Sequence, residues 1–475
     1  MSKVHEIINN AISLISPSWA LERSQAQLAY ESVRRYSGAR QRKNETWFPA
    51  NTDADSAIIN DLPNLRARSR DLVRNNSWAA SIIDSFVKYV VADGIELQAS
   101  KEGAEESLRE QLLNIDIAGN YSFYEDQALA LRQMLIDGEA FIRLIIFGGR
   151  LRLQLIEADQ IWSSSTSSQF GNEIHAGIEI DKDTGRQVAF YVNDHPGKYG
   201  STTNSEVRVL AQDMIHLYMR QRPGQTRGVP ILAPVINVLR DLGELTEAAI
   251  VSCRVAACIS AAIKRQYHPT PQKDAEDKPY ETLQPGMIAK LRPGEDIVLL
   301  DPKQPGEVFP VFTQLLLRSV AAGVGLSYET VSKNYSETNY NAARTSLLNE
   351  RKTLKCMQQF LITHLCERIG EELQLLRFLR GEGSRKLKLY WQPPGFEWVD
   401  PEKEVVSQIL AVQNNLATKS SIIAERGGDW REIMKQRKIE KDKENELGIT
   451  PEPVNNKPTK SIVSDTSLDP AKNAG

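Results

Sequence analysis

Four acidic residues, Asp137, Glu139, Glu157 and Asp159, surround a stretch in which apolar and polar residues alternate. Carboxylates gathered in this way can hold the two metal ions of a nuclease. Neither lysine nor histidine occurs near them at a spacing typical of that chemistry, and turns and helix caps use the same acidic residues. We therefore interpret the four carboxylates as structural, with a metal-dependent nuclease or hydrolase as the alternative.

Other catalytic motifs are incomplete. Gly197-Lys198 lacks the upstream glycine of a phosphate-binding loop. Ser327 lacks the closing glycine of a nucleophile elbow. Asp213 and His216 are close enough in sequence to share a metal, but a structural aspartate and a hydrogen-bonded core histidine are the favoured interpretation. We therefore expect no enzymatic activity, no cofactor and no metal.

The polar segment 332–340 has side chains suited to weak contacts with a phosphate backbone. The candidate contact residues are Lys333, Asn334, Tyr335, Glu337, Asn339 and Tyr340. Each neutralised phosphate adds a salt-sensitive increment of affinity, so many lysines would hold DNA in place. A single lysine offset by Glu337 favours sliding contact. An ordinary connector between two helices is the alternative.

Composition indicates a folded chain with more than one domain or lobe. The chain has 475 residues, 41% of them hydrophobic and 25% charged, and a formal net charge of −3. This balance does not indicate a tight, strongly basic nucleic-acid binder. The most apolar run, 248–263, is shorter than the roughly 20 apolar residues that span a bilayer, so we expect no membrane segment. The cysteines are interpreted as reduced core residues: Cys253, Cys258, Cys356 and Cys366.

A long helical pattern from 235 to 265 dominates the middle of the chain, because apolar residues recur there every three or four positions. Such a helix would be about 45 Å long, which suits an oligomeric stalk better than a pocket. We expect identical neighbours to cover its apolar stripe. The candidate subunit-contact residues are Arg240, Asp241, Glu244, Glu247, Ala249, Arg254, Ala256 and Lys264.

The remaining patterns predict an α+β fold. Helical patterns at 65–91 and 121–135 precede a β-rich stretch from 140 to 217, which includes a hairpin of 141–147 with 151–155. Eight of the 22 prolines fall between Lys264 and Pro310, so this insert cannot be helical. Helical pattern returns near 311, again over 340–380, and after Pro401.

Several stretches, taken in order, resemble the lambda family of phage portal proteins. They are 65–76, the turn 137–139, 222–230, 339–344, 391–401 and 423–429. The similarity extends over roughly residues 20 to 447. It implies an elongated portal-type subunit with a β-rich wing, two stem helices, a proline-rich clip, a tunnel loop followed by a long helix, and a helical crown.

The resemblance implies this division of the chain: wing 1–234, first stem helix 235–265, clip 266–310, second stem helix 311–331, tunnel loop 332–340, long helix 341–380 and crown 381–447. The segment 448–475 matches none of these parts, and its polar composition predicts a disordered tail. It also implies a homo-oligomeric ring, typically of twelve copies, at one vertex of the phage head. Double-stranded DNA would pass through it without sequence preference.

The expected partners are the large terminase subunit, head–tail adaptor proteins, and the major capsid and scaffold proteins. The expected location is the virion, after assembly in the host cytoplasm. A monomeric adaptor or scaffold protein that binds partners through the insert is a further alternative.

Overall fold

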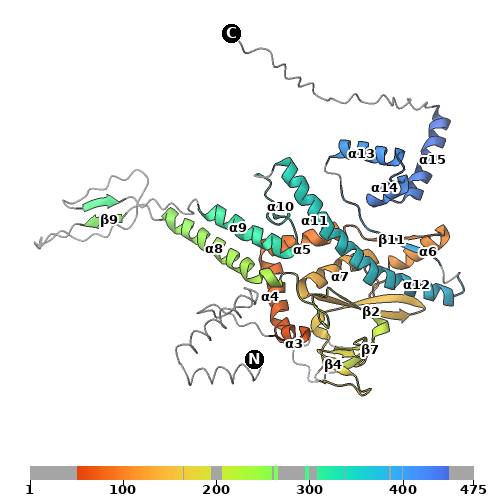
Figure 1. The fold of residues 1–475 in the computed structure, drawn as a ribbon, viewed down its shortest axis with the longest axis horizontal. Helices are drawn as coiled ribbons and strands as arrows, with labels where there is room; N and C mark the ends of the chain where they lie inside the picture. The colour runs from red at the N-terminus through yellow and green to blue at the C-terminus, as the bar shows by residue number, and fades with distance from the viewer. Residues whose placement is uncertain are drawn as a thin grey trace, which may run out of the picture. The chain divides into compact units, whose positions relative to one another are not determined.

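The computed structural model describes residues 51–163, 165–193, 206–258, 262–265, 295–298, 308–336, 339–383, 387–397 and 400–448. Contacts divide the chain into two units, Met1–Asp53 and Ala54–Gly475. Every element described below belongs to the second unit, which mixes helices with small sheets, as an α+β fold requires. The ribbon is drawn in Figure 1.

Helices precede the sheets along the chain. They are α3 (Ala54–Ile58), α4 (Leu62–Asn75), α5 (Ser77–Val90), α6 (Glu102–Leu112) and α7 (Phe123–Asp137). The expectation of one helix over 65–91 is wrong, because Asn76 has an extended backbone between α4 and α5. Its side chain accepts hydrogen bonds from the N–H groups of Trp78 and Ala79 and so caps α5.

The predicted hairpin is confirmed, and it forms the centre of a β lobe. One sheet has the order β3-β2-β8 and consists of β2 (Glu139–Phe147), β3 (Arg150–Ile156) and β8 (Met214–Tyr218). The other has the order β4-β5-β6-β7 and consists of β4 (Glu173–His175), β5 (Ile178–Ile180), β6 (Gln187–Asn193) and β7 (Glu206–Leu210). Within the hairpin, Phe141 pairs with Ile156 and Phe147 with Arg150.

The long middle helix is shorter than the sequence predicts. Helix α8 is Ile236–Cys258, preceded by the 3-10 turn Ala233–Val235. Ala262–Arg265, expected to continue the helix, is strand β9 and pairs antiparallel with β10 (Glu295–Val298). Ladder hydrogen bonds to β10 satisfy the backbone of this segment in place of helical ones. Residues 266–294 and 299–307 of the proline-rich insert lie outside the described residues. Its last three residues, Val308–Pro310, are helical, so the expectation that the whole insert is non-helical is wrong there.

The second helix expected in this region, 311–331, is two helices. They are α9 (Val308–Val324) and α10 (Tyr328–Ser332). Gly325 has φ +78°, which ends α9, and the Ser327 hydroxyl accepts from the Thr330 N–H and caps α10. Pro310 lies in the first turn of α9, where a missing N–H costs no helical hydrogen bond.

The expected long helix over 341–380 contains one irregularity. Helix α11 (Tyr340–Leu361) continues through a π-helical turn (Ile362–Cys366) into α12 (Glu367–Leu379). Strand β11 (Leu389–Gln392) then pairs antiparallel with β1 (Glu96–Ala99). The last helices are α13 (Pro401–Gln413), α14 (Lys419–Glu425) and α15 (Trp430–Leu447), which we name the crown helices. Of the predicted disordered tail, 448–475, Gly448 caps the end of α15 with φ +66°, and residues 449–475 lie outside the described residues.

One hydrophobic core joins helices that are far apart in sequence. It contains Phe86 of α5, Leu131 of α7, Leu239 of α8, Val320 of α9 and Leu365 of the π turn. A smaller core lies in the β lobe around Phe141 and Phe190. No described helix combines the length and apolar character that crossing a bilayer requires.

Candidate functional site

The polar loop between α10 and α11 begins with an anchored lysine. Lys333 has φ +56° and caps α10 through its N–H, which donates to the Glu329 carbonyl at 2.8 Å. Its Nζ donates to the Ser85 hydroxyl at 3.2 Å, so the loop is attached to α5. Burial, with a contribution from Lys88, lowers the pKa of Lys333. The one cation predicted for DNA contact therefore also has a structural role.

Of the neighbouring loop residues, the two asparagines make local hydrogen bonds and the two tyrosines expose their aromatic rings. Asn334 accepts hydrogen bonds from the backbone and hydroxyl of Ser336, and Asn339 caps α11 by accepting from the Ala342 N–H at 2.8 Å. Tyr335 is 59% exposed and Tyr340 51% exposed. Glu337 lies outside the described residues. The described loop therefore exposes two aromatic rings beside the polar side chains of Lys333, Ser336 and Asn339.

The stripe on α8 is divided between the chain's own core and solvent. Leu239 and Leu242 are fully buried inside the single chain. The expectation that identical neighbours cover this first half of the stripe is therefore wrong. Farther along α8, Ile250 is 47% and Val251 49% exposed.

Helix α9, which lies beside α8 (Figure 1), adds exposed apolar side chains. They are Val311, Phe312 and Leu315, which are 65%, 47% and 61% exposed. We name Ile250, Val251, Val311, Phe312 and Leu315 the stem face. Sequence periodicity missed it, because the pattern shows that a stripe exists but not which neighbours cover each part.

The predicted charged residues of α8 differ in their surroundings. Arg240 pairs with Glu244 one turn later at 2.8 Å, with both side chains mostly exposed. Asp241, Glu247 and Arg254 are exposed, whereas Ala249 is half-buried. Ala256 lies in α8, and Lys264 lies in β9, away from the helix where it was expected.

The acidic residues of the hairpin region lie in a cluster of ionic side chains. Glu139 has a fully buried side chain and contacts both Arg66 and Arg227. It also accepts from His216 Nε2 at 2.9 Å and from the Gly228 N–H at 3.0 Å. All of its hydrogen-bonding capacity is directed to groups of the chain itself.

The two aspartates of the same region bind a second arginine. Arg70 makes two 2.7 Å hydrogen bonds to the Asp137 carboxylate and one of 2.5 Å to Asp159. Arg66 donates to the Asp137 carbonyl at 3.1 Å and to Asp159 at 3.3 Å. We name Arg66, Arg70, Asp137, Glu139, Asp159, His216 and Arg227 the arginine–carboxylate cluster.

The electrostatics of this cluster oppose metal binding. Burial alone would raise the pKa of Glu139, but Arg227, His216 and Arg66 outweigh it and hold that pKa well below its usual range. Burial lowers the pKa of His216, which keeps the imidazole neutral. Because the guanidinium groups already supply positive charge at short range, a divalent cation would have to displace them.

The clustering of these residues depends on a close backbone approach. Gly138 has φ +90°, and a Cβ built there would lie 2.4 Å from the backbone of Val229. Gly228 is equally tight against the Gly138 carbonyl. Only glycines allow the segment that carries Arg227 to lie this close to the start of β2. Both glycines lie in stretches that resemble the lambda family, but they are far apart in sequence, so spacing alone does not predict their contact.

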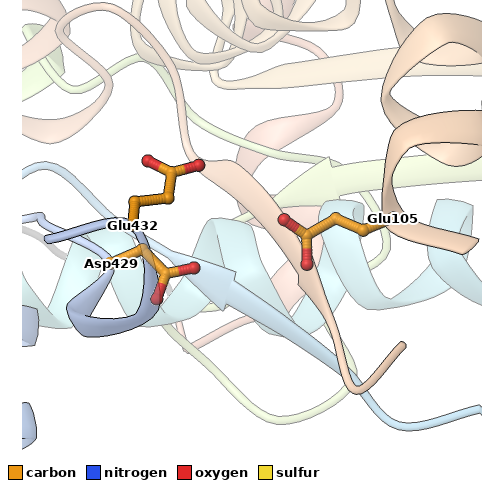
Figure 2. Close-up of side chains that lie close together, drawn as sticks. All are labelled: Glu105, Asp429 and Glu432. Carbon is orange, nitrogen blue, oxygen red and sulfur yellow. The ribbon is translucent and has the colours of Figure 1, made fainter. Parts of the chain in front are cut away.

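A second acidic group lies where α15 begins. Among the described residues, Glu105, Asp429 and Glu432 have carboxylate oxygens within 4.8 Å of one another. Figure 2 shows the carboxylates of Glu105 and Asp429 facing each other across the space between α6 and the start of α15. Sequence spacing gives no signal for this group, because Glu105 lies more than 300 positions from Asp429 and Glu432.

Two arginines neutralise this second group. Arg431 pairs with Asp429 at 2.7 Å and with Glu105 at 3.1 Å, and donates to the Ala99 carbonyl at 2.7 Å. Arg109 lies 3.4 Å from Glu105 and 3.5 Å from Glu432. Burial opposes ionisation of Asp429, but Arg431 outweighs it and lowers the pKa of that carboxyl. The group fastens α15 to α6 and β1.

Three similar proteins of known name are all portal proteins of phages. "Probable portal protein" of Halomonas phage phiHAP-1 is 26% identical over 443 residues, which cover 85% of each chain. "Portal protein B" of Escherichia phage lambda is 25% identical over 481 residues, covering 86% of this chain and 88% of the relative. The portal protein of Escherichia phage N15 is 25% identical over 480 residues, covering 85% and 89%.

Solved structures that resemble the chain are more distant. The neck of a native GTA particle, computed with C12 symmetry, has a TM-score of 0.47 and 15% identity, covering 76% of this chain and 93% of that chain. An HK97-family portal protein from Corynebacterium diphtheriae has a TM-score of 0.34 and 11% identity, covering 68% and 94%. The family profile described as "Phage portal protein, lambda family" matches residues 40–358. Because this profile covers more than half of the chain, the chain belongs to the lambda family of phage portal proteins.

Proposed function

We propose that this protein forms a closed ring, of twelve copies as is typical of the family, at one vertex of the phage head. Double-stranded DNA enters and leaves through its channel without sequence recognition. The ring also provides the docking surface for the large terminase subunit and later for head–tail adaptor proteins. It contacts the major capsid and scaffold proteins during assembly in the host cytoplasm and remains in the virion.

The observation that carries the ring is the stem face. Five large apolar side chains on α8 and α9 are between 47% and 65% exposed in the single chain. Large apolar side chains exposed on two adjacent helices favour a contact with another protein surface. In a ring, each copy presents this face to the next copy through a heterologous contact that closes on itself.

The loop after α10 suits a channel lining in this proposal. Tyr335 and Tyr340 present exposed rings, and Lys333, which is also exposed, is held in place by its hydrogen bond to Ser85. Few cations near DNA keep the binding weak and the duplex mobile. The loop joins α10 to α11, and we propose that it is the tunnel loop of the ring.

Substitution of the stem face tests the ring. Val251→Glu places a charge at a half-exposed position, so the single chain should fold, while burial of that charge between copies should prevent ring assembly. Asn237→Glu is the matched control, because it adds the same charge at an exposed polar position of the same helix.

Native mass spectrometry and negative-stain microscopy give the measurement. We expect rings for the wild type and for Asn237→Glu, and monomers with wild-type circular dichroism for Val251→Glu. Wild-type protein that stays monomeric at high concentration would favour the adaptor alternative. Intact rings of Val251→Glu would show that the stem face is not a subunit contact.

We infer that the protein is not an enzyme. The carboxylates on which a nuclease would depend, Asp137, Glu139 and Asp159, bind Arg66, Arg70 and Arg227. Incubation of the purified protein with plasmid DNA and Mg²⁺ or Mn²⁺ tests this directly. Nicking that Asp159→Ala abolishes would restore the nuclease alternative.

A further inference from the structure

The crown helices bury very little within a single chain. None of the residues of α13, α14 or α15 is buried. Short helices in water owe most of their stability to an apolar face packed against another surface. The crown helices therefore carry apolar side chains that nothing in the described part of the single chain covers completely.

Helix α13 presents one defined stripe to solvent. Val406, Ile409 and Leu410 occupy neighbouring positions on the helix and are 52%, 51% and 51% exposed. Exposed Glu402 lies on the same stripe, one turn before Val406. Read from its N-terminal end, the α13 stripe is therefore acidic first and apolar afterwards.

Helix α15 presents the opposite order. Trp430, Ile433 and Met434 share one side of the helix and are 49%, 41% and 52% exposed. Arg437 and Lys438 follow on the same side, one turn later, and are exposed. Read from its N-terminal end, the α15 stripe is apolar first and basic afterwards.

These two stripes match when the helices run antiparallel. Glu402 then faces Arg437 and Lys438, and the apolar side chains of α13 meet those of α15. A parallel arrangement would place the acidic end of one stripe against the apolar end of the other. The positions of the apolar side chains and the positions of the charges therefore both favour an antiparallel pairing of α13 with α15.

We propose that α13 of one copy packs antiparallel against α15 of the next copy. Within one chain both stripes stay about half exposed, so the chain does not cover them itself. A second copy is the occupant because each chain carries both complementary halves, as a heterologous ring contact requires. This inference rests on the proposed ring and adds a second contact to it, separate from the stem face.

A charge exchange tests the contact without changing apolar packing. Glu402→Lys, and separately Arg437→Glu with Lys438→Glu, should each raise the protein concentration at which half of the rings dissociate by about tenfold. All three substitutions together should return it to within about twofold of wild type. Lys443→Glu, on the opposite side of α15, is the control and should leave ring stability unchanged.

A cysteine pair tests the geometry directly. Val406→Cys with Met434→Cys, made with Cys356→Ser because Cys356 is exposed, should give a ladder of disulfide-linked oligomers on oxidation of assembled rings. Val406→Cys with Lys443→Cys is the matched control and should give none. Each single-cysteine variant shows the background.

The outcomes separate this inference from the proposed function. Wild-type rings with neither the charge rescue nor the ladder would overturn the crown contact alone and leave the ring standing. Wild-type protein without rings and without a ladder would overturn both. Disulfides formed only within monomers would show that α13 and α15 meet in one chain, which also overturns the proposal.

Discussion

Replacing Arg227 with methionine tests whether the arginine–carboxylate cluster holds the β lobe together. The Arg227 side chain is 3% exposed, and its Nε donates to Glu139 at 2.8 Å. The guanidinium also donates to the carbonyls of Ile161, Ala158 and Ala176. Methionine keeps the length of the side chain and removes every one of these bonds.

The expected cost follows from what is left behind. Glu139 would remain buried with its charge, partnered by Arg66, His216 and the Gly228 N–H. Breaking a buried ion pair by removing one partner costs about 3–5 kcal/mol. Because Arg66, His216 and the Gly228 N–H remain, we expect the free energy of unfolding to fall by about 3 kcal/mol, at the lower end of that range.

Urea unfolding of the full-length protein, followed by tryptophan fluorescence, gives the measurement. Arg240→Met is the matched control, because Arg240 and Glu244 form a pair whose side chains are 69% and 61% exposed. Such a pair contributes less than about 1 kcal/mol, so this variant should unfold close to the wild-type midpoint. Adding Glu139→Gln to Arg227→Met should recover at least about 1 kcal/mol, because the uncompensated charge is gone.

The pH dependence provides an independent check. The folded pKa of Glu139 is depressed, so its stabilising contribution is complete above the unfolded pKa and is lost as pH falls below it. Without Arg227 that depression weakens. The stability difference between wild type and Arg227→Met should therefore stay constant from pH 7 to about pH 5, and shrink as pH falls below the usual glutamate pKa of 4.5 towards the folded pKa. A cost equal to that of Arg240→Met, or a difference that grows on acidification, would refute the reasoning.

Two further substitutions probe single residues. Burial raises the pKa of Asp126 to about 7, so this residue favours folding below its unfolded pKa, and that benefit is lost as pH rises through about 7. Asp126→Asn should stabilise the protein by about 1 kcal/mol at pH 8 and have little effect at pH 4. This figure allows for solvent screening and for the favourable interaction of the charge with the N-terminus of α7. Equal effects at both pH values would contradict the prediction. Lys333 has φ +56°, a backbone conformation that glycine adopts easily and valine does not. Lys333→Gly should therefore change the urea midpoint little, whereas Lys333→Val should lower the free energy of unfolding by about 1–3 kcal/mol. Equal midpoints for the two variants would refute strain at this position.

Elements specified by local pattern could be predicted from the sequence. The alternation in 141–147 and 151–155 with Gly148-Gly149 between them predicts the hairpin, and the structure pairs those residues as β2 and β3. Helix ends were harder to place. Asn76 ends one helix and caps the next, a role that its side chain takes only when its own backbone is extended.

The arginine–carboxylate cluster could not be predicted, for a topological reason. Its acidic members were singled out from the sequence, but their partners come from α4 and from the segment around β8. Arg66 lies 73 positions from Glu139 and Arg227 lies 88 positions away. Spacing rules detect partners within one turn or one hairpin, so a search for a nearby lysine or histidine was bound to miss these arginines.

Whether a charged residue is already paired within its own chain also matters for the proposed stem contact. Arg240 and Glu244 satisfy each other within α8, so they offer a neighbouring copy little net charge. Asp241, Glu247 and Arg254 are exposed and form no ion pair with another described residue. Among the predicted charged residues of α8, these three are therefore available to contact the next copy. The apolar centre of such a contact would be the stem face, because residues whose charges are already paired inside one chain contribute least to binding another.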